Sequence, residues 1–279
     1  MTNTSEAGRL ARLPRGFVYA TTGEAYTITA RRAARRMRQV CPDIPIDLFT
    51  DQEVEDPVFD HIHRLNRSTH RPKMEAMGRS RFGSTILLDS DTIVVTDISE
   101  LFSMTRRFPL SAAFCVARAS HLYGTQRDIP RWFPTFNAGL MVFRRGRRSR
   151  QLARSWQRMM DEGQLEFDQP SLRRLAWDLS LPVGIVPPEY NLIHIKMLQV
   201  WQPHMGAPRL LHMRKLHRQP PGDPEKPLDY HEELPPKLAE MIDELLAAEA
   251  QYELYGGPRN PPRNRLHRLL RVMRRRLFD

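Results

Sequence analysis

The chain has 279 residues, of which 41% are hydrophobic and 8% aromatic, so it can form a core and is not a disordered protein. That length suits one large domain with a tail or two small domains. The net charge of +11 is uneven: residues 259–279 contain eight arginines and one aspartate, a charge of +7, and the rest carries only +4. Contact with a polyanion or a membrane is therefore expected to be local to the tail.

The sequence favours a cytoplasmic protein, or one attached to a membrane only at its surface. Residues 1–15 lack the apolar stretch of a signal peptide, and no segment reaches the apolar length of a transmembrane helix. The two cysteines, Cys41 and Cys115, are too few for a disulfide framework or a zinc cluster, which fits a reducing compartment.

Short apolar stretches alternate with helix-like stretches along the chain, and this alternation predicts an α/β protein with a mainly parallel, layered sheet. The expected strands are Phe17–Thr22, Ile46–Thr50, Ser84–Leu88, Ala112–Ala117, Phe136–Phe143 and Val183–Val186. The expected helices are residues 25–39, Pro72–Ser80, Asp97–Phe102, Ser149–Asp161, Gln169–Leu179 and Pro235–Tyr255. Trp132, Trp156 and Trp177 are expected to be core or packing residues and not platforms for a sugar.

The most informative stretch is the apolar run Ser84–Leu88, which ends in Asp89-Ser90-Asp91 and is followed by a second short apolar run. An unpaired buried carboxylate costs several kcal/mol to desolvate, so two acids at this point need a compensating charge. A divalent cation held by carboxylate oxygens supplies that charge. In open α/β sheets, ligands bind at the carboxyl ends of the strands. A D-x-D alone occurs by chance in many proteins, and a surface turn remains the plain alternative.

Several later features align with this pair. Lys73 lies on the helix that precedes the acidic strand, and Asn137-Ala138-Gly139 opens another strand with small residues. Asp168-Gln169 begins a helix, and His212 ends an apolar stretch. Each has a structural alternative, because lysine is often a solvated helix residue, asparagine a turn residue and aspartate a helix cap.

The ordered set resembles the GT-A nucleotide-sugar glycosyltransferases, and within them glycosyltransferase family 8 and its relatives. The resemblance spans about residues 16–218 and rests on these pieces: Phe17–Thr22 with Tyr26, Lys73, Leu87–Asp91, Phe136–Leu140, Asp168-Gln169, Tyr190-Asn191 and Leu211-His212. It implies a GT-A fold for residues 16–218, preceded by an N-terminal segment at 1–15. We expect a proline-rich linker and amphipathic helix at 219–257, and a basic amphipathic tail at 258–279.

The resemblance also implies roles for individual residues. Asp89, Asp91 and His212 would bind Mn²⁺ or Mg²⁺, and imidazole with carboxylates suits Mn²⁺ better. The donor would be a nucleotide-diphosphate sugar, with uridine as the usual base of the family. The donor would contact Ala20, Thr21, Tyr26, Lys73, Asp89, Ser90, Asp91, Asn137, Ala138, Gly139 and Lys215. Lys73, Asp168 and Gln169 would serve catalysis, with retention of the anomeric configuration.

Two departures from the family pattern leave assignments open. Many relatives follow the metal-binding histidine with a glycine and then a phosphate-binding lysine, whereas His212 is followed by Met213-Arg214-Lys215-Leu216-His217-Arg218. Lys215 or Arg218 could contact the phosphate. The loop after the first strand also lacks an acid–asparagine pair that is common in the family, which puts base selectivity in doubt.

The tail has leucines and Met273 at helical spacing among its arginines, so it is predicted to lie on an anionic membrane surface. The acceptor would be a glycan or glycolipid in the synthesis of a surface polysaccharide or lipopolysaccharide. No nucleic-acid-binding module is recognised. Two alternatives remain: a haloacid-dehalogenase-type phosphohydrolase, which also places D-x-D after a strand, and a non-catalytic protein that binds sugar nucleotides.

Overall fold

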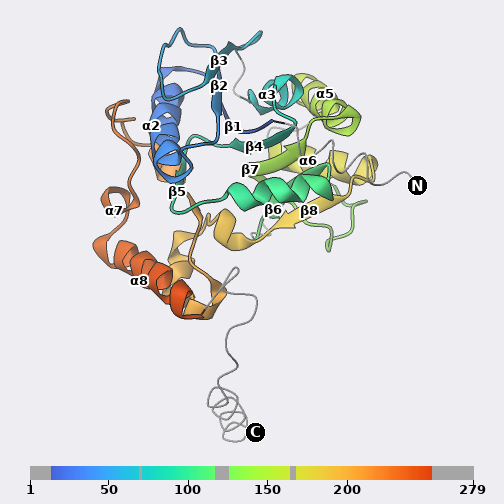
Figure 1. Ribbon diagram of the computed structural model, residues 1–279. Helices are drawn as coiled ribbons and strands as arrows, with labels where there is room; N and C mark the ends of the chain where they lie inside the picture. Colours follow the sequence, from blue (N-terminus) through green and yellow to red (C-terminus); the bar gives the residue numbers. More distant parts are fainter. Residues whose placement is uncertain (1–13, 69–70, 117–125, 164–167, 253–279) are drawn as a thin grey trace, which may run out of the picture.

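A computed structural model describes residues 14–68, 71–116, 126–163 and 168–252 of the chain. The predicted basic tail at 258–279 lies outside these residues, as does nearly all of the expected N-terminal segment. Figure 1 shows a central sheet with helices on both faces.

A seven-stranded sheet in the order β3-β2-β1-β4-β7-β6-β8 forms the centre of the molecule. Its strands are β1 (Arg15–Thr21), β2 (Ile46–Thr50), β3 (His61–Arg64), β4 (Ser84–Leu88), β6 (Leu110–Phe114), β7 (Phe136–Arg144) and β8 (Val183–Val186). Strand β7 runs antiparallel to both of its neighbours, and all other pairings in this sheet are parallel. A second, two-stranded antiparallel sheet joins β5 (Thr92–Val94) to β9 (Leu210–His212). The prediction of a mainly parallel α/β sheet is confirmed.

Helices cover both faces of the large sheet. The α-helices are α2 (Glu24–Val40), α3 (Lys73–Arg79), α5 (Arg147–Asp161), α6 (Asp168–Asp178), α7 (Tyr230–Glu233) and α8 (Pro236–Tyr252). The 3₁₀ helices are η1 (Ser99–Arg106), η2 (Pro188–Tyr190), η3 (Ile195–Val200), η4 (Pro203–Met205) and η5 (Arg214–His217).

The alternation of side chains along the strands divides the interior into two hydrophobic clusters. In β1, Phe17 and Tyr19 belong to one cluster, and Val18 between them belongs to the other. The first cluster lies under α2 and α8, and the second under α3, α5 and α6 (Figure 1). Both faces of β1 and β4 are therefore covered, which explains their continuous apolar sequences.

Arginines of α2 attach the C-terminal segment to the rest of the fold. Arg31 and Arg35 form ion pairs with Asp56 and Glu225, and Arg32 donates hydrogen bonds to the carbonyls of Pro221 and Lys226. Further along, Ile242 and Leu245 of α8 lie in the same hydrophobic cluster as Phe17. The described part of 219–257 thus shares a core with residues 16–218.

Two local features differ from the expected pattern. Strand β3 reads His-Ile-His-Arg and is a half-exposed edge strand, so its sequence lacks the apolar signal of a buried strand. Strands β5 and β9 have three residues each, too few to show a period. Trp132 lies outside the core: it is 73% exposed and packs edge-on against Trp177, the second of the two settings expected for it. Trp156 is fully buried, as expected.

Candidate active site

A cavity of about 590 Å³ opens at the carboxyl ends of β1 and β4. It gathers most of the residues predicted for the site: Ala20, Thr21, Tyr26, Lys73, Asp89, Ser90, Asp91, Asn137, Gly139, Asp168, Gln169 and His212. The lining also includes Arg218, which the sequence left as an alternative to Lys215 for the phosphate contact. Five further lining residues were not predicted: Thr22, Arg71, Pro72, Arg214 and His217. Two predicted residues, Ala138 and Lys215, are absent from the lining.

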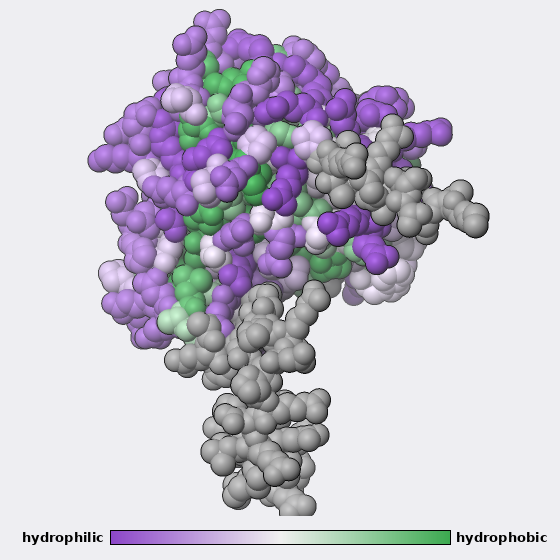
Figure 2. All heavy atoms as spheres, viewed as in Figure 1, coloured by the Kyte–Doolittle hydropathy of each residue, from purple (hydrophilic) through white to green (hydrophobic). Residues whose placement is uncertain are grey.

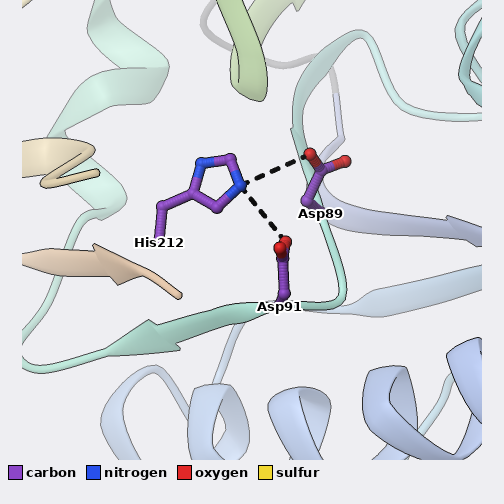
Figure 3. Close-up of side chains that lie close together, drawn as sticks. All are labelled: Asp89, Asp91 and His212. Carbon is purple, nitrogen blue, oxygen red and sulfur yellow. Dashed lines mark ion pairs between the residues drawn. The ribbon is translucent and has the colours of Figure 1, made fainter. Parts of the chain in front are cut away.

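Asp89, Asp91 and His212 converge at this cavity (Figure 3). Asp89 and Asp91 lie in the turn between β4 and β5, and His212 is the last residue of β9. His212 Nε2 is 3.2 Å from Asp91 Oδ1 and 3.8 Å from Asp89 Oδ2. The three side chains each offer a ligand atom, and these atoms lie within 4.8 Å of one another.

The pairing of β5 with β9 places the histidine beside the acids. Thr92 lies opposite His212 in this pair, and Met213 N donates to Asp91 O at 2.8 Å. Gly139 makes room for the imidazole: a Cβ on this residue would lie 2.2 Å from His212 Cε1. A side chain at position 139 and the imidazole therefore exclude each other, which gives the glycine a specific role in the site.

A chain of amide hydrogen bonds fixes the imidazole orientation. His212 Nδ1 is 3.2 Å from Asn191 Oδ1, and Asn191 Nδ2 donates to Asn137 Oδ1 at 2.8 Å. Asn137 Oδ1 also accepts a hydrogen bond from Gly139 N. Since Nδ1 faces Asn191, Nε2 faces the two carboxylates, the arrangement that orients metal-binding histidines. Asn191 supports the site from behind the imidazole and is absent from the cavity lining.

These residues fit a divalent cation. Asp91 is 3% exposed, and its Oδ1 is buried without a hydrogen-bond partner of adequate geometry. A buried carboxylate oxygen left in this state is costly unless a cation or donor meets it. Two carboxylates and one imidazole form a donor set that suits Mn²⁺. The three residues are therefore a candidate metal site.

Charged neighbours keep this cluster ionised. Burial alone would raise the pKa of Asp91, but His212 and His217 beside it lower that pKa to about 2. Burial would lower the pKa of His212, and the carboxylates of Asp91 and Asp89 raise it instead. Both effects reflect attraction between opposite charges in a site that is shielded from water.

Lys73 joins the metal-site acids to Asp168. Its Nζ lies 2.7 Å from Asp89 Oδ1 and 3.4 Å from Asp168 Oδ2, and Arg71 is 3.6 Å from the same Asp168 oxygen. Burial would raise the pKa of Asp168, but Lys73 and Arg71 lower it, so Asp168 is a carboxylate. Next to it, Gln169 Oε1 is buried without a hydrogen-bond partner. Both side chains line the cavity and can bind hydroxyl groups.

The conformation of η5 and of Arg218 after it determines which basic side chains after His212 face the cavity. Arg214 and Arg218 line it, whereas Lys215 Nζ donates to the carbonyl of Glu233 and pairs with its carboxylate at 3.1 Å. His217 lies 2.9 Å from Ser90 Oγ and 3.4 Å from Asp91 Oδ2, and its ring meets Tyr26 edge-on. A four-residue 3₁₀ helix is too short to show which side chains point inward, so the place of His217 in the lining could not be predicted from the sequence.

Ala138 faces away from the cavity because successive residues of a strand point to opposite faces. Its neighbours Asn137 and Gly139 line the cavity, while Ala138 is buried in the hydrophobic cluster under α3, α5 and α6.

Solved structures of glycosyltransferases match the fold. GlyE of Streptococcus pneumoniae TIGR4 has a TM-score of 0.53 and 17% identity, over 88% of this chain and 66% of that one. The galactosyltransferase LgtC, in complex with donor and acceptor sugar analogs, has a TM-score of 0.54 and 12% identity, over 82% and 95% of the two chains. An active-site mutant of LgtC gives a TM-score of 0.56 over the same shares.

The chain has the GT-A fold. At these identities the likeness concerns the fold, and this confirms the expected fold class. The chain spans 66% of the GlyE chain, just under two thirds. No protein-family model and no curated protein sequence matches. Among the residues that the structure describes, no helix is long and apolar enough to cross a membrane.

Proposed function

We propose that the chain is a metal-dependent glycosyltransferase that takes a glycosyl group from a nucleotide-diphosphate sugar, with UDP as the nucleotide. The observation that carries the proposal is the convergence of Asp89, Asp91 and His212 at the cavity, with Asp91 Oδ1 buried next to His212 and without a hydrogen bond of adequate geometry to a described residue. This arrangement sits at the strand ends of a GT-A fold, where open α/β sheets bind their ligands.

The cavity offers separate groups for each part of such a donor. Tyr26, Ala20 and Thr21 belong to the lining and would receive the nucleoside. Arg214 and Arg218 bring two guanidinium groups into the lining, and guanidinium groups bind phosphate through paired hydrogen bonds. Of the two candidates, we propose Arg218 for the phosphate contact, because it lines the cavity and Lys215 pairs with Glu233.

Asp168 and Gln169 would bind the hydroxyl groups of the sugar. The carboxylate of Asp168 can only accept, and the unpartnered Oε1 of Gln169 can accept another hydroxyl hydrogen. Hydrogen-bonding groups left unpaired by a wrong sugar would penalise it, so these two residues would contribute to sugar selection. Lys73 holds both Asp89 and Asp168, and would keep the metal site and the sugar site in register.

Transfer breaks the bond between the anomeric carbon and the diphosphate, and negative charge grows on the departing phosphate. Arg214 and Arg218 would stabilise that charge as it forms. A cation held by Asp89, Asp91 and His212 would supply the Lewis-acid stabilisation of the same oxygens. The configuration at the anomeric carbon is proposed to be retained, and the acceptor to be a glycan or a membrane glycolipid used in surface polysaccharide synthesis. We place the enzyme in the cytoplasm, at the inner face of the membrane.

The experiment that tests this function is a turnover assay with a panel of sugar nucleotides. The purified protein is incubated with each donor, with Mn²⁺ or with a chelator, and nucleotide release and sugar transfer are both measured. Mn²⁺-dependent release of UDP from one UDP-sugar, increased by a glycan or glycolipid acceptor, is the expected result. Lys215→Ala serves as a control that keeps full turnover, because this side chain lies outside the cavity.

Other outcomes would point to the remaining alternatives. Hydrolysis of phosphate esters without sugar transfer would indicate a phosphohydrolase. Mn²⁺-dependent donor binding without turnover over a broad acceptor panel would indicate a protein that binds sugar nucleotides and does not transfer them.

A further inference from the structure

The outer face of α5 carries five arginines, and a sixth, Arg145, lies two residues before the helix. We call this set the arginine face: Arg145, Arg147, Arg148, Arg150, Arg154 and Arg158. All six side chains are exposed, and none forms an ion pair with another described residue. By contrast, Arg31, Arg35, Arg81 and Arg174, elsewhere on the molecule, all have carboxylate partners.

The spacing places four of these residues on one line. Arg147, Arg150, Arg154 and Arg158 are separated by three, four and four residues, so they form a row along one side of the helix, about 17 Å long. The opposite side carries Leu152, Ala153 and Trp156, which are buried against the sheet. All four residues of the row are exposed. In Figure 2 the surface over the place of α5 in Figure 1 is mainly hydrophilic.

This arrangement weakens the helix that carries it. Three arginines lie at the start of α5, where the positive end of the helix dipole favours acids, and the first turn contains no acidic residue. Like charges four residues apart, as in Arg150 with Arg154 and Arg154 with Arg158, also repel. No ion pair with a described residue offsets these costs, and the buried side chains of α5 do not require arginines on the opposite side. The charge row is therefore better explained by an anionic partner than by the stability of the fold.

The arginine face extends toward the active-site cavity. Strand β7 begins at the cavity with Asn137 and ends at Arg144, and α5 then runs back along the flank. Near its end, Trp156 Nε1 donates to Ser171 Oγ in the first turn of α6, three residues after Asp168. A partner that lies along α5 would therefore reach the level of the cavity.

A flat partner fits this surface better than a nucleic acid. Helix α5 is flanked by α3 and α6, so it cannot enter the major groove of a duplex as an isolated recognition helix does. The arginine face contains no aromatic side chain on which bases could stack. A row of arginines on a broad face matches an anionic bilayer, to which each basic residue near the surface adds attraction.

We propose that the arginine face is a docking surface for an anionic lipid bilayer, on which α5 lies parallel to the membrane. The proposal concerns the folded body of the protein and is separate from the predicted membrane contact of residues 259–279. It does not depend on the glycosyltransferase function, because binding is measured without donor or acceptor.

The test measures co-flotation of the full-length protein with vesicles of phosphatidylcholine alone or mixed with phosphatidylglycerol. The variant Arg150→Glu/Arg154→Glu/Arg158→Glu should bind the anionic vesicles roughly 100-fold more weakly than the unaltered protein, about fivefold for each arginine. A matched control, Lys196→Glu/Lys226→Glu/Lys237→Glu, changes the net charge equally at three exposed lysines on other elements. It should lose only a few-fold in affinity. Circular dichroism checks that both variants stay folded.

Equal loss in the two triple variants would overturn the proposal, since it would show that net charge alone governs binding. Unchanged binding of the arginine variant would overturn it as well. Binding of the unaltered protein to duplex DNA or RNA, with none to anionic vesicles at the same ionic strength, would replace the bilayer with a nucleic acid. Turnover on a soluble acceptor should be the same in the arginine variant and the unaltered protein, which keeps this test distinct from that of the proposed function.

Discussion

Two buried carboxylates, Asp56 and Asp91, show how a structural charge cluster differs from a candidate site. Both oxygens of Asp56 are saturated by the protein: Arg31 and Arg35 donate to Oδ2, and Arg35 and the Val58 amide donate to Oδ1. In Asp91, Oδ1 is buried without a hydrogen-bond partner and faces His212 and the cavity. In the first cluster, protein groups satisfy the whole carboxylate, and the cluster attaches a loop to α2. In the second, Asp91 Oδ1 has room for a further positive partner, which a ligand can supply.

The largest expected effect comes from removing the carboxylate of Asp91 from the second cluster. Asp91→Ala removes a carboxylate that the candidate metal site needs, and should reduce Mn²⁺-dependent turnover on the order of 1,000-fold. The fold should remain intact, because the side chain that is lost contacts His212 and His217 of the site, and the backbone hydrogen bond from Met213 N to Asp91 O is kept. Turnover and thermal unfolding are measured on the same sample. Unchanged Mn²⁺-dependent turnover in this variant would remove Asp91 from the metal site.

A smaller effect is expected from crowding the imidazole. Gly139→Ala places a methyl group 2.2 Å from His212 Cε1, so the ring must leave the position in which its Nε2 faces the carboxylates. Mn²⁺ affinity should fall roughly 10- to 100-fold, as for changes that disturb the orientation of a metal ligand. Titration with Mn²⁺, followed by its paramagnetic resonance signal, measures this loss. Gly163→Ala is a useful control, because no atom lies within 4 Å of a Cβ at this exposed position, although its positive φ adds some strain.

A change in the Asp56 cluster should lower stability and leave donor binding unchanged, the opposite of the changes at the candidate site. Asp56→Ala leaves Arg31 and Arg35 without their shared partner and should lower the free energy of unfolding by about 2 kcal/mol. The ion pairs of Arg31 and Arg35 join α2 to the loop around Glu225, and none of these residues lines the cavity. The donor affinity of the folded protein should therefore stay the same. Denaturant unfolding and donor binding measure the two quantities. A large loss of donor affinity would show that the two clusters are coupled, and would contradict the assignment of a purely structural role to the Asp56 cluster.

The smallest effect separates the two cations that the sequence could not distinguish. Arg218→Ala should raise the KM for the donor about tenfold, since one charge-assisted phosphate contact is lost. Lys215→Ala should leave KM unchanged, because Lys215 pairs with Glu233. Steady-state kinetics with varied donor decide between them. The reverse pattern would assign the phosphate contact to Lys215 and require η5 to reorient.

Local sequence patterns predicted the centre of the site well. Asp89 and Asp91 follow a buried strand directly, so their position at a sheet end could be deduced from the residues beside them. Ala138 could also have been excluded from the sequence, since residues 137 and 139 of one strand share a face that residue 138 does not. Its inclusion followed the family pattern and not the geometry of the strand.

Other parts of the site depended on contacts between distant segments. His217 meets Ser90 and Tyr26 only because η5 lies across the mouth of the cavity, far along the chain from both. Asn191 orients His212 through a hydrogen bond between residues 21 positions apart. The exposure of Trp132 likewise depends on the surrounding fold and not on its own side chain. The ion pairs of the α2 arginines with Glu225 could not be predicted for the same reason, because they join segments that are far apart in the sequence.

The most direct test of the metal-dependent donor site is calorimetric titration of UDP into the protein, with and without Mn²⁺, alongside the variants Asp91→Asn and Asp56→Asn. We expect UDP to bind only with Mn²⁺, and this binding to be lost in Asp91→Asn and retained in Asp56→Asn. UDP binding of equal strength with and without Mn²⁺, or equal affinity in the two variants, would contradict the assignment of the open carboxylate cluster to a metal and a nucleotide diphosphate.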